Sequence, residues 1–103
     1  MQVLQLEATP RTMVGGGAGR QARANKRVPA ILYGFQVEKP IALTVDEHTF
    51  EKGLRRLAGD NVLIDLSIKG HPGTSRVFLR EVQRDPLSGK MIHVDFLKID
   101  ESQ

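Results

Sequence analysis

Short stretches in which apolar and polar residues alternate run through the whole chain. Alternation with a period of two is typical of half-buried β-strands. In 75–84 the alternation slips, because Val82 falls on the opposite side from Val77 and Leu79, and this predicts a β-bulge near Arg80 and Glu81. Six stretches are predicted to form strands: 3–8, 30–33, 41–45, 62–69, 75–84 and 91–99.

One segment, 47–58, has the periodicity of an amphipathic helix instead. Its apolar residues recur at the spacing i, i+4 and i+7, and they are Phe50, Leu54 and Leu57. Asp46 precedes the segment and is a suitable N-cap. Glu51 stands four residues before Arg55, so we expect the two side chains to pair on the helix surface.

A basic loop, 15–34, precedes and includes the second predicted strand and reads GGGAGRQARANKRVPAILYG. If a short helix forms here, the spacing of Arg20, Arg23 and Arg27 places their guanidinium groups along one side. Pro29 forbids the helix from continuing and favours an extended residue before it. Such a helix has about two turns, so we expect tertiary contacts or a bound partner to order it.

Strands therefore dominate, with two short helices and no internal repeat. The predicted fold is mainly β: a six-stranded antiparallel barrel, closed or nearly closed, because closure removes exposed sheet edges in a small domain. The 103 residues fit one domain spanning 1–103, with a single modest core.

The basic charge is concentrated near the N-terminus. The formal net charge is +3, but residues 1–34 hold five Lys or Arg and one acid, whereas 35–103 hold ten Lys or Arg and eleven acids. This asymmetry favours a polyanionic partner such as nucleic acid, and the alternative is a solvated basic loop. The chain has no cysteine, no apolar run long enough to span a membrane and no signal-peptide pattern, so we expect a cytoplasmic protein without a membrane partner.

His93 and Asp95 are the most informative pair in the last predicted strand. Because Ile92, Val94 and Phe96 are predicted to face the core, His93 and Asp95 project together from the other face. The pair can exchange hydrogen bonds with base edges or ribose. The alternative is an ordinary polar pair on a strand surface.

Tyr33 and three arginines are further candidates for contact with a ligand. Tyr33 is either a core aromatic residue or a platform for a base or sugar. Arg76, Arg80 and Arg84 lie on one face of their strand and would extend the positive surface if that face is exposed. The alternative is a solvated face with salt bridges to Asp65, Glu81 or Asp85.

Catalytic and metal-binding motifs are not apparent in the sequence. No serine lies in a G-x-S-x-G context, and the three histidines are scattered without a second ligand at metal-binding spacing. The nucleotide-binding loop patterns are absent as well. We therefore predict no enzymatic activity, no catalytic residue, no metal, no cofactor and no small-molecule substrate.

Three motifs in this order resemble the bacterial large-subunit ribosomal protein L-twenty-five family, which includes the N-terminal domain of the general stress protein Ctc. They are the glycine-rich loop with Arg20-x-x-Arg23 and VPAILYG at 28–34, EVQRDP at 81–86, and HVDFL at 93–97. The resemblance implies a six-stranded barrel that binds the loop E region of 5S ribosomal RNA through its widened minor groove. It implies RNA contacts at Arg11, Arg20, Arg23, Tyr33, Arg80, His93 and Asp95.

The resemblance also implies a structural role on the ribosome, with 5S RNA as a partner and other large-subunit components as further partners. Arg80 stands where family members can carry a shorter glutamine, so its expected contact is either a base or a phosphate. The family contains single-domain members and longer ones with a C-terminal domain. A second hypothesis is a protein-interaction or general-stress module whose basic loop meets an acidic protein partner.

Overall fold

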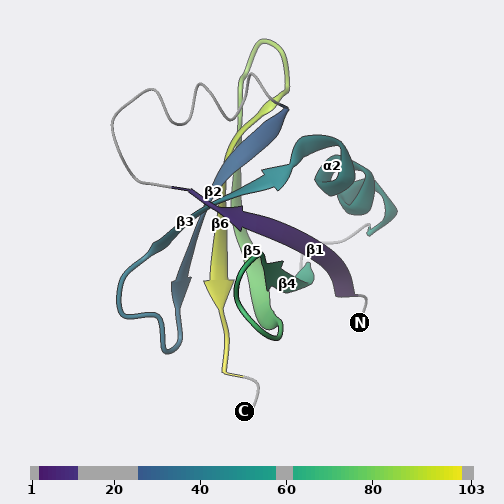
Figure 1. The fold of residues 1–103 in the computed structure, drawn as a ribbon. Coiled ribbons are helices and arrows are strands. Elements are labelled where there is room, and N and C mark those ends of the chain that lie inside the picture. Colours follow the sequence, from purple (N-terminus) through teal and green to yellow (C-terminus); the bar gives the residue numbers. More distant parts are fainter. Residues whose placement is uncertain (1–2, 12–25, 58–61, 101–103) are drawn as a thin grey trace.

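The computed structural model describes residues 3–11, 26–57 and 62–100, and in this part of the chain six strands close into a barrel (Figure 1). The strands follow one another around the barrel in the order β1-β3-β2-β6-β5-β4. The elements are β1 (Val3–Pro10), β2 (Arg27–Gly34), β3 (Ile41–Asp46), α2 (Glu47–Arg56), β4 (Leu63–Ile68), β5 (Ser75–Arg84) and β6 (Met91–Lys98). The predicted six-stranded, mainly β barrel is confirmed.

The strand pairing is mixed, which corrects the prediction of a purely antiparallel barrel. β1 runs parallel to β4, with Val3 opposite Leu63, and β2 runs parallel to β6, with Ala30 opposite Val94. In both cases other elements lie between the partners in sequence, so the connection is a long crossover and not a hairpin. The four remaining pairs are antiparallel, including the hairpin of β2 and β3.

Strand β2 begins at Arg27, three residues earlier than predicted. Arg27 lies opposite Asp46 of β3 and Pro29 lies opposite Thr44, so the proline is accommodated inside the strand. Arg27 therefore does not lie on a helix beside Arg20 and Arg23. Those two residues, and the rest of that predicted helix before Lys26, lie outside the described residues.

The core fills the barrel interior with inward-facing apolar residues from all six strands and is completed by α2. Helix α2 lies beside β1 (Figure 1), and its Phe50 packs edge-on against Phe96 of β6 with ring centroids 6.0 Å apart. Both phenylalanines are fully buried. The largest buried side chains include Leu32, Leu43, Ile64, Leu66, Val28, Val45, Val77 and Val94. No helix in the described part is long and apolar enough to cross a membrane.

The predicted helix cap is confirmed, and the predicted surface pair on the helix is wrong. Asp46 Oδ2 accepts a hydrogen bond from the Thr49 backbone N–H at 2.9 Å. Glu51 pairs across the fold with Arg84 of β5, where Nη2 lies 2.7 Å from Oε1, and not with Arg55 on its own helix. The i, i+4 spacing brings Arg55 near, but the Arg84 guanidinium approaches from a neighbouring element and forms the hydrogen bonds.

The predicted β-bulge lies where the sequence indicated. The register of β5 on β6 shifts between Leu79, opposite Phe96, and Glu81, opposite Asp95. Val82 then lies opposite Val94 and packs against the core. The extra residue, Arg80, is left exposed on the outside of the barrel.

Candidate nucleic-acid interface

His93 and Asp95 lie together on the outer face of β6, as predicted. The predicted alternation is wrong at the start of the strand, where Met91 and not Ile92 is buried in the core, because the register on β5 shifts there. Val94 between them is fully buried, so its two neighbours point outward. His93 Nδ1 is 3.1 Å from Asp95 Oδ1, and the side chains are 29% and 24% exposed. A carboxylate at Nδ1 favours the tautomer with its proton on that nitrogen, which leaves Nε2 to accept a hydrogen bond.

The strand register extends this outer face across four strands. Asp95 lies opposite Glu81 of β5 on one side and opposite Ile31 of β2 on the other. Ile31 in turn lies opposite Ala42 of β3, whose carbonyl accepts the Arg11 backbone N–H at 3.0 Å. Arg11 and Asp95 thus lie in one row of paired residues that runs across the strands. Three strand-to-strand steps of about 4.8 Å separate them, or roughly 14 Å measured along the sheet.

The Tyr33 side chain lies on the outside of the barrel and not in its interior. Its neighbour Leu32 is buried in the core, so Tyr33 points outward from β2 and is half-buried. Tyr33 lies opposite Leu97, two residues beyond Asp95 on β6, so it is a diagonal neighbour of the aspartate on the same face. The platform interpretation is compatible with this position, and the core interpretation is not.

Arg80 lies beside the pair, but the predicted row of three strand arginines does not form. Arg76 Nε binds Asp65 Oδ1 at 2.7 Å, and this salt bridge is one of the alternatives predicted for it. Arg84 is held by Glu51 of α2 and also donates to the Gly89 carbonyl at 2.9 Å. The bulge at Arg80 reverses the side-chain alternation along β5, so the three side chains do not share one face.

Arg11 follows β1 directly and is anchored to β3. Besides its backbone hydrogen bond to Ala42, its Nε donates to the Leu43 carbonyl at 3.0 Å. A guanidinium carries N–H donors in a fixed fork, so Nε can hold the side chain in place while the Nη groups serve an anionic ligand. The side chain is half-buried and remains accessible.

Five predicted contact residues therefore lie on the outside of the barrel along one run of neighbouring strands, which we call the β6 wall: Arg11, Tyr33, Arg80, His93 and Asp95. Arg20 and Arg23 lie outside the described residues. Sequence reasoning did not place Glu81 and Gln83 beside the pair, and they lie opposite Asp95 and His93. The missing information was the register between β5 and β6, which one sequence with a bulge does not reveal.

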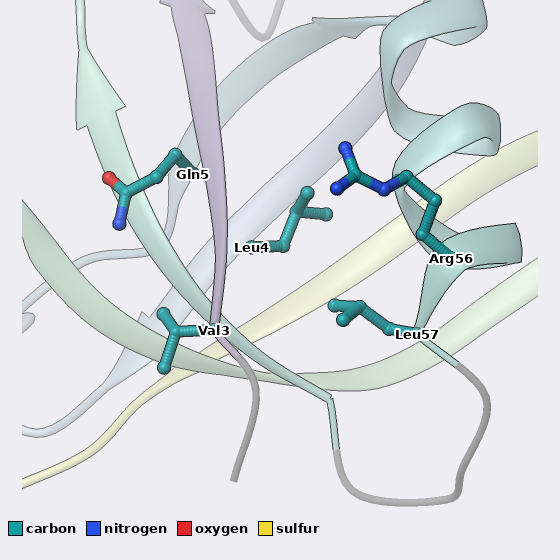
Figure 2. A pocket seen from close by; sticks show the side chains of 6 residues that line it. Val3, Leu4, Gln5, Arg56 and Leu57 are labelled. Atoms are coloured by element: carbon teal, nitrogen blue, oxygen red, sulfur yellow. The ribbon is translucent and has the colours of Figure 1, made fainter.

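A pocket of about 500 Å³ opens elsewhere on the molecule, between β1 and the last turns of α2. Figure 2 shows Leu4 of β1 pointing toward the helix, with Arg56 and Leu57 on the opposite side. Its other lining residues are Val3, Gln5 and Gly53, and none belongs to the β6 wall. Within the described residues, no group of three or more His, Asp or Glu could hold a metal ion.

Comparison with known proteins gives matches over nearly the whole chain. The model of the family described as "Ribosomal L25p family" matches residues 6–96. A relative from Desulfosudis oleivorans, named large ribosomal subunit protein bL25, is 38% identical over 97% of this chain and 45% of its own length. One from Symbiobacterium thermophilum, named bL25B, is 39% identical over 94% and 48%. The chain spans about half the length of these curated relatives.

Proposed function

The chain belongs to the ribosomal L25p family, and from this premise we propose that it is a non-catalytic structural component of the bacterial large ribosomal subunit which binds the loop E region of 5S ribosomal RNA. Residues 1–103 supply the RNA-binding barrel domain. Its proposed location is the ribosome in the cytoplasm, where other large-subunit components can be further partners. The names of the relatives support the ribosomal part of the proposal.

The observation that carries the RNA-binding part is the composition of the β6 wall. The His93–Asp95 pair, with Nδ1 3.1 Å from Oδ1, offers directional donors and acceptors, and Arg11 and Arg80 flank it with positive charge. Folded RNA exposes phosphates, 2′-hydroxyls and base edges across a wide, shallow minor groove. A rigid wall with charge at its sides and hydrogen-bonding groups between them suits such a groove.

Each residue of the wall has a distinct role in this proposal. Arg11 and Arg80 bind phosphates or base edges through their guanidinium groups, as do Arg20 and Arg23 of the basic loop. His93 and Asp95 bind base edges or ribose hydroxyls, and Tyr33 supports a sugar or base. The base-or-phosphate alternative for Arg80 can be distinguished by the salt dependence of binding, because phosphate contacts dominate that dependence.

The test is the affinity of variants for a 5S RNA fragment containing loop E, measured at several salt concentrations. Arg11→Ala should weaken binding and reduce the salt slope by about 1, as loss of one phosphate contact predicts. Arg20→Ala combined with Arg23→Ala should flatten the slope further. His93→Ala should weaken binding with little change in slope. Lys69→Ala and His71→Ala, at exposed positions beyond the end of β4, are the matched controls.

Affinity unchanged in Arg11→Ala, His93→Ala and the loop double variant would overturn the proposal. If the unaltered chain binds plain duplex RNA with equal affinity, the binding is non-specific charge attraction and not recognition of loop E. Binding to an acidic protein with no RNA binding would favour the protein-interaction module. Footprinting of the purified chain on 5S RNA would then locate the protected nucleotides.

A further inference from the structure

The Arg27 side chain connects three strands on the outside of the barrel. It starts on β2, and its Nε donates to Thr44 Oγ1 of β3 at 2.9 Å. Its Nη2 donates to the Thr44 carbonyl at 3.0 Å and to Thr9 Oγ1 of β1 at 3.1 Å. One guanidinium thus joins β2 to β1 across the strand that lies between them.

The positions of the three residues in the sheet explain this bridge. Thr44 lies opposite Thr9 on one side and Pro29 on the other, and Arg27 lies two residues before Pro29 on the same outward face. Thr44 is only 7% exposed, so its hydroxyl oxygen needs a partner within the protein. Arg27 supplies that partner, and the nearby carboxylate of Asp46 partly compensates its charge.

The Arg27 bridge ends at the short pairing between β1 and β3. β1 pairs with β3 only through Ala8, Thr9 and Pro10, whereas its parallel pairing with β4 extends from Val3 to Ala8. Arg11 follows immediately, held to β3 by its own bonds to Ala42 and Leu43. The Arg27 bond to Thr9 therefore fixes the end of β1 two residues before Arg11.

From this geometry we infer, on the basis of the proposed function, that Arg27 is a positioning residue for RNA binding. It holds the end of β1 against β3 so that Arg11 stands at a fixed place on the β6 wall, and it does not itself bind phosphate. Its nitrogens Nε and Nη2 are used inside the protein. A lysine cannot replace it, because a single ammonium does not present the same planar fork to both threonines.

Salt-dependent binding to the 5S RNA fragment distinguishes positioning from direct contact. Arg27→Ala should weaken binding roughly tenfold, as expected for the loss of hydrogen bonds to a charged group. When it is added to Arg11→Ala, where the contact that Arg27 positions is already lost, it should leave the salt slope unchanged. Arg27→Lys should fail to restore the affinity. Thr9→Val, which removes the oxygen and keeps the side-chain shape, should weaken binding, and Thr9→Ser, which keeps the oxygen, should not. Thermal unfolding checks that each variant is folded, and if Arg27→Ala unfolds, the Thr9 pair carries the test.

Three results would overturn the inference. They are unchanged affinity in Arg27→Ala and Thr9→Val, a salt slope reduced by about a further 1 when Arg27→Ala is added to Arg11→Ala, or full rescue by Arg27→Lys. The last two would show that Arg27 contacts phosphate directly.

Hydrogen exchange gives a readout that does not depend on RNA. The Arg11 amide, which donates to the Ala42 carbonyl, should exchange about tenfold faster or more in Arg27→Ala, because the end of β1 opens more often. Amides of β4, such as that of Leu66, are the control and should change less. If the unaltered chain does not bind the RNA, the proposed function fails by itself, and the exchange rates still decide whether Arg27 holds β1.

Discussion

Glu51 shows how a single side chain chooses between a partner on its own helix and one on another element. The i, i+4 spacing favours Arg55, and the structure pairs Glu51 with Arg84. Local spacing is visible in a sequence, whereas the approach of β5 to α2 is a property of the folded barrel. The hydrogen bond from Arg84 is the main cause that lowers the pKa of the Glu51 carboxyl below its ordinary value, although burial opposes it.

The lowered pKa of Glu51 gives a prediction for stability against pH. A carboxyl whose folded pKa lies below the unfolded value of 4.5 stabilises the fold above that pH, and the contribution is lost as the pH falls through the folded pKa. Glu51→Gln should therefore lower the free energy of unfolding near neutral pH by less than about 1 kcal/mol, since both side chains are partly exposed. The difference from the unaltered chain should shrink as the pH falls below 4.5.

Denaturant unfolding at a series of pH values is the measurement. Glu38→Gln, at an exposed position in the turn after β2, serves as the control. A difference between Glu51→Gln and the unaltered chain that stays constant from neutral to acid pH would contradict the role given to Arg84.

At the scale of the elements, the end of β2 depends on a glycine. Gly34 has φ +114°, and a Cβ there would lie 2.7 Å from the Lys98 carbonyl oxygen and 2.7 Å from Leu97 Cδ1. The first neighbour is backbone of the parallel strand β6, so it cannot move aside cheaply. Gly70 also has a positive φ, +89°, but nothing lies within 4 Å of its Cβ position.

These two glycines make a matched pair of substitutions. Gly70→Ala should lower the free energy of unfolding by about 1 kcal/mol through backbone strain alone. Gly34→Ala should add to that strain about 1–3 kcal/mol of steric overlap. Chemical denaturation of both variants measures the difference, and equal losses would show that the contact with β6 is unimportant.

The elements were largely predictable from sequence, and the exceptions have physical causes. The period of two located the strands, and the misplaced Val82 located the bulge. The start of β2 was missed because glycines, closely spaced arginines and Pro29 indicate a helix and its end. The alternation of Arg27, Pro29, Ile31 and Tyr33 on one outward face was the signal that could have found it.

At the scale of the whole molecule, β1 closes the barrel, because it pairs with β3 on one side and with β4 on the other. Leu6 is the largest of its fully inward side chains and is 3% exposed. Leu6→Ala should lower the free energy of unfolding by about 2–5 kcal/mol, as cavities in packed cores do. Leu87→Ala, at a position that is 96% exposed, should change it by less than about 0.5 kcal/mol. Thermal or urea unfolding compares them, and a small loss for Leu6→Ala would mean that β1 contributes little to the core.

The candidate site was predictable in part. The His93–Asp95 pair follows from alternation within one strand, so the sequence alone brought the two side chains together. Arg11, Tyr33 and Arg80 come from three other places in the chain, and only the register of the strands shows that they share a wall with that pair. The parallel pairing of β2 with β6 was the missing step, because hairpin reasoning joins only neighbours in sequence.

The closed ring of strands has a consequence for how a ligand can be accommodated. Each of the six strands has a partner on both sides. A strand therefore cannot shift its register, and no further strand can be added, unless existing strand pairs break. The curvature of the barrel surface is therefore fixed. A ligand that binds this surface has to change its own shape to match it, so selectivity among ligands depends on how easily each one is deformed.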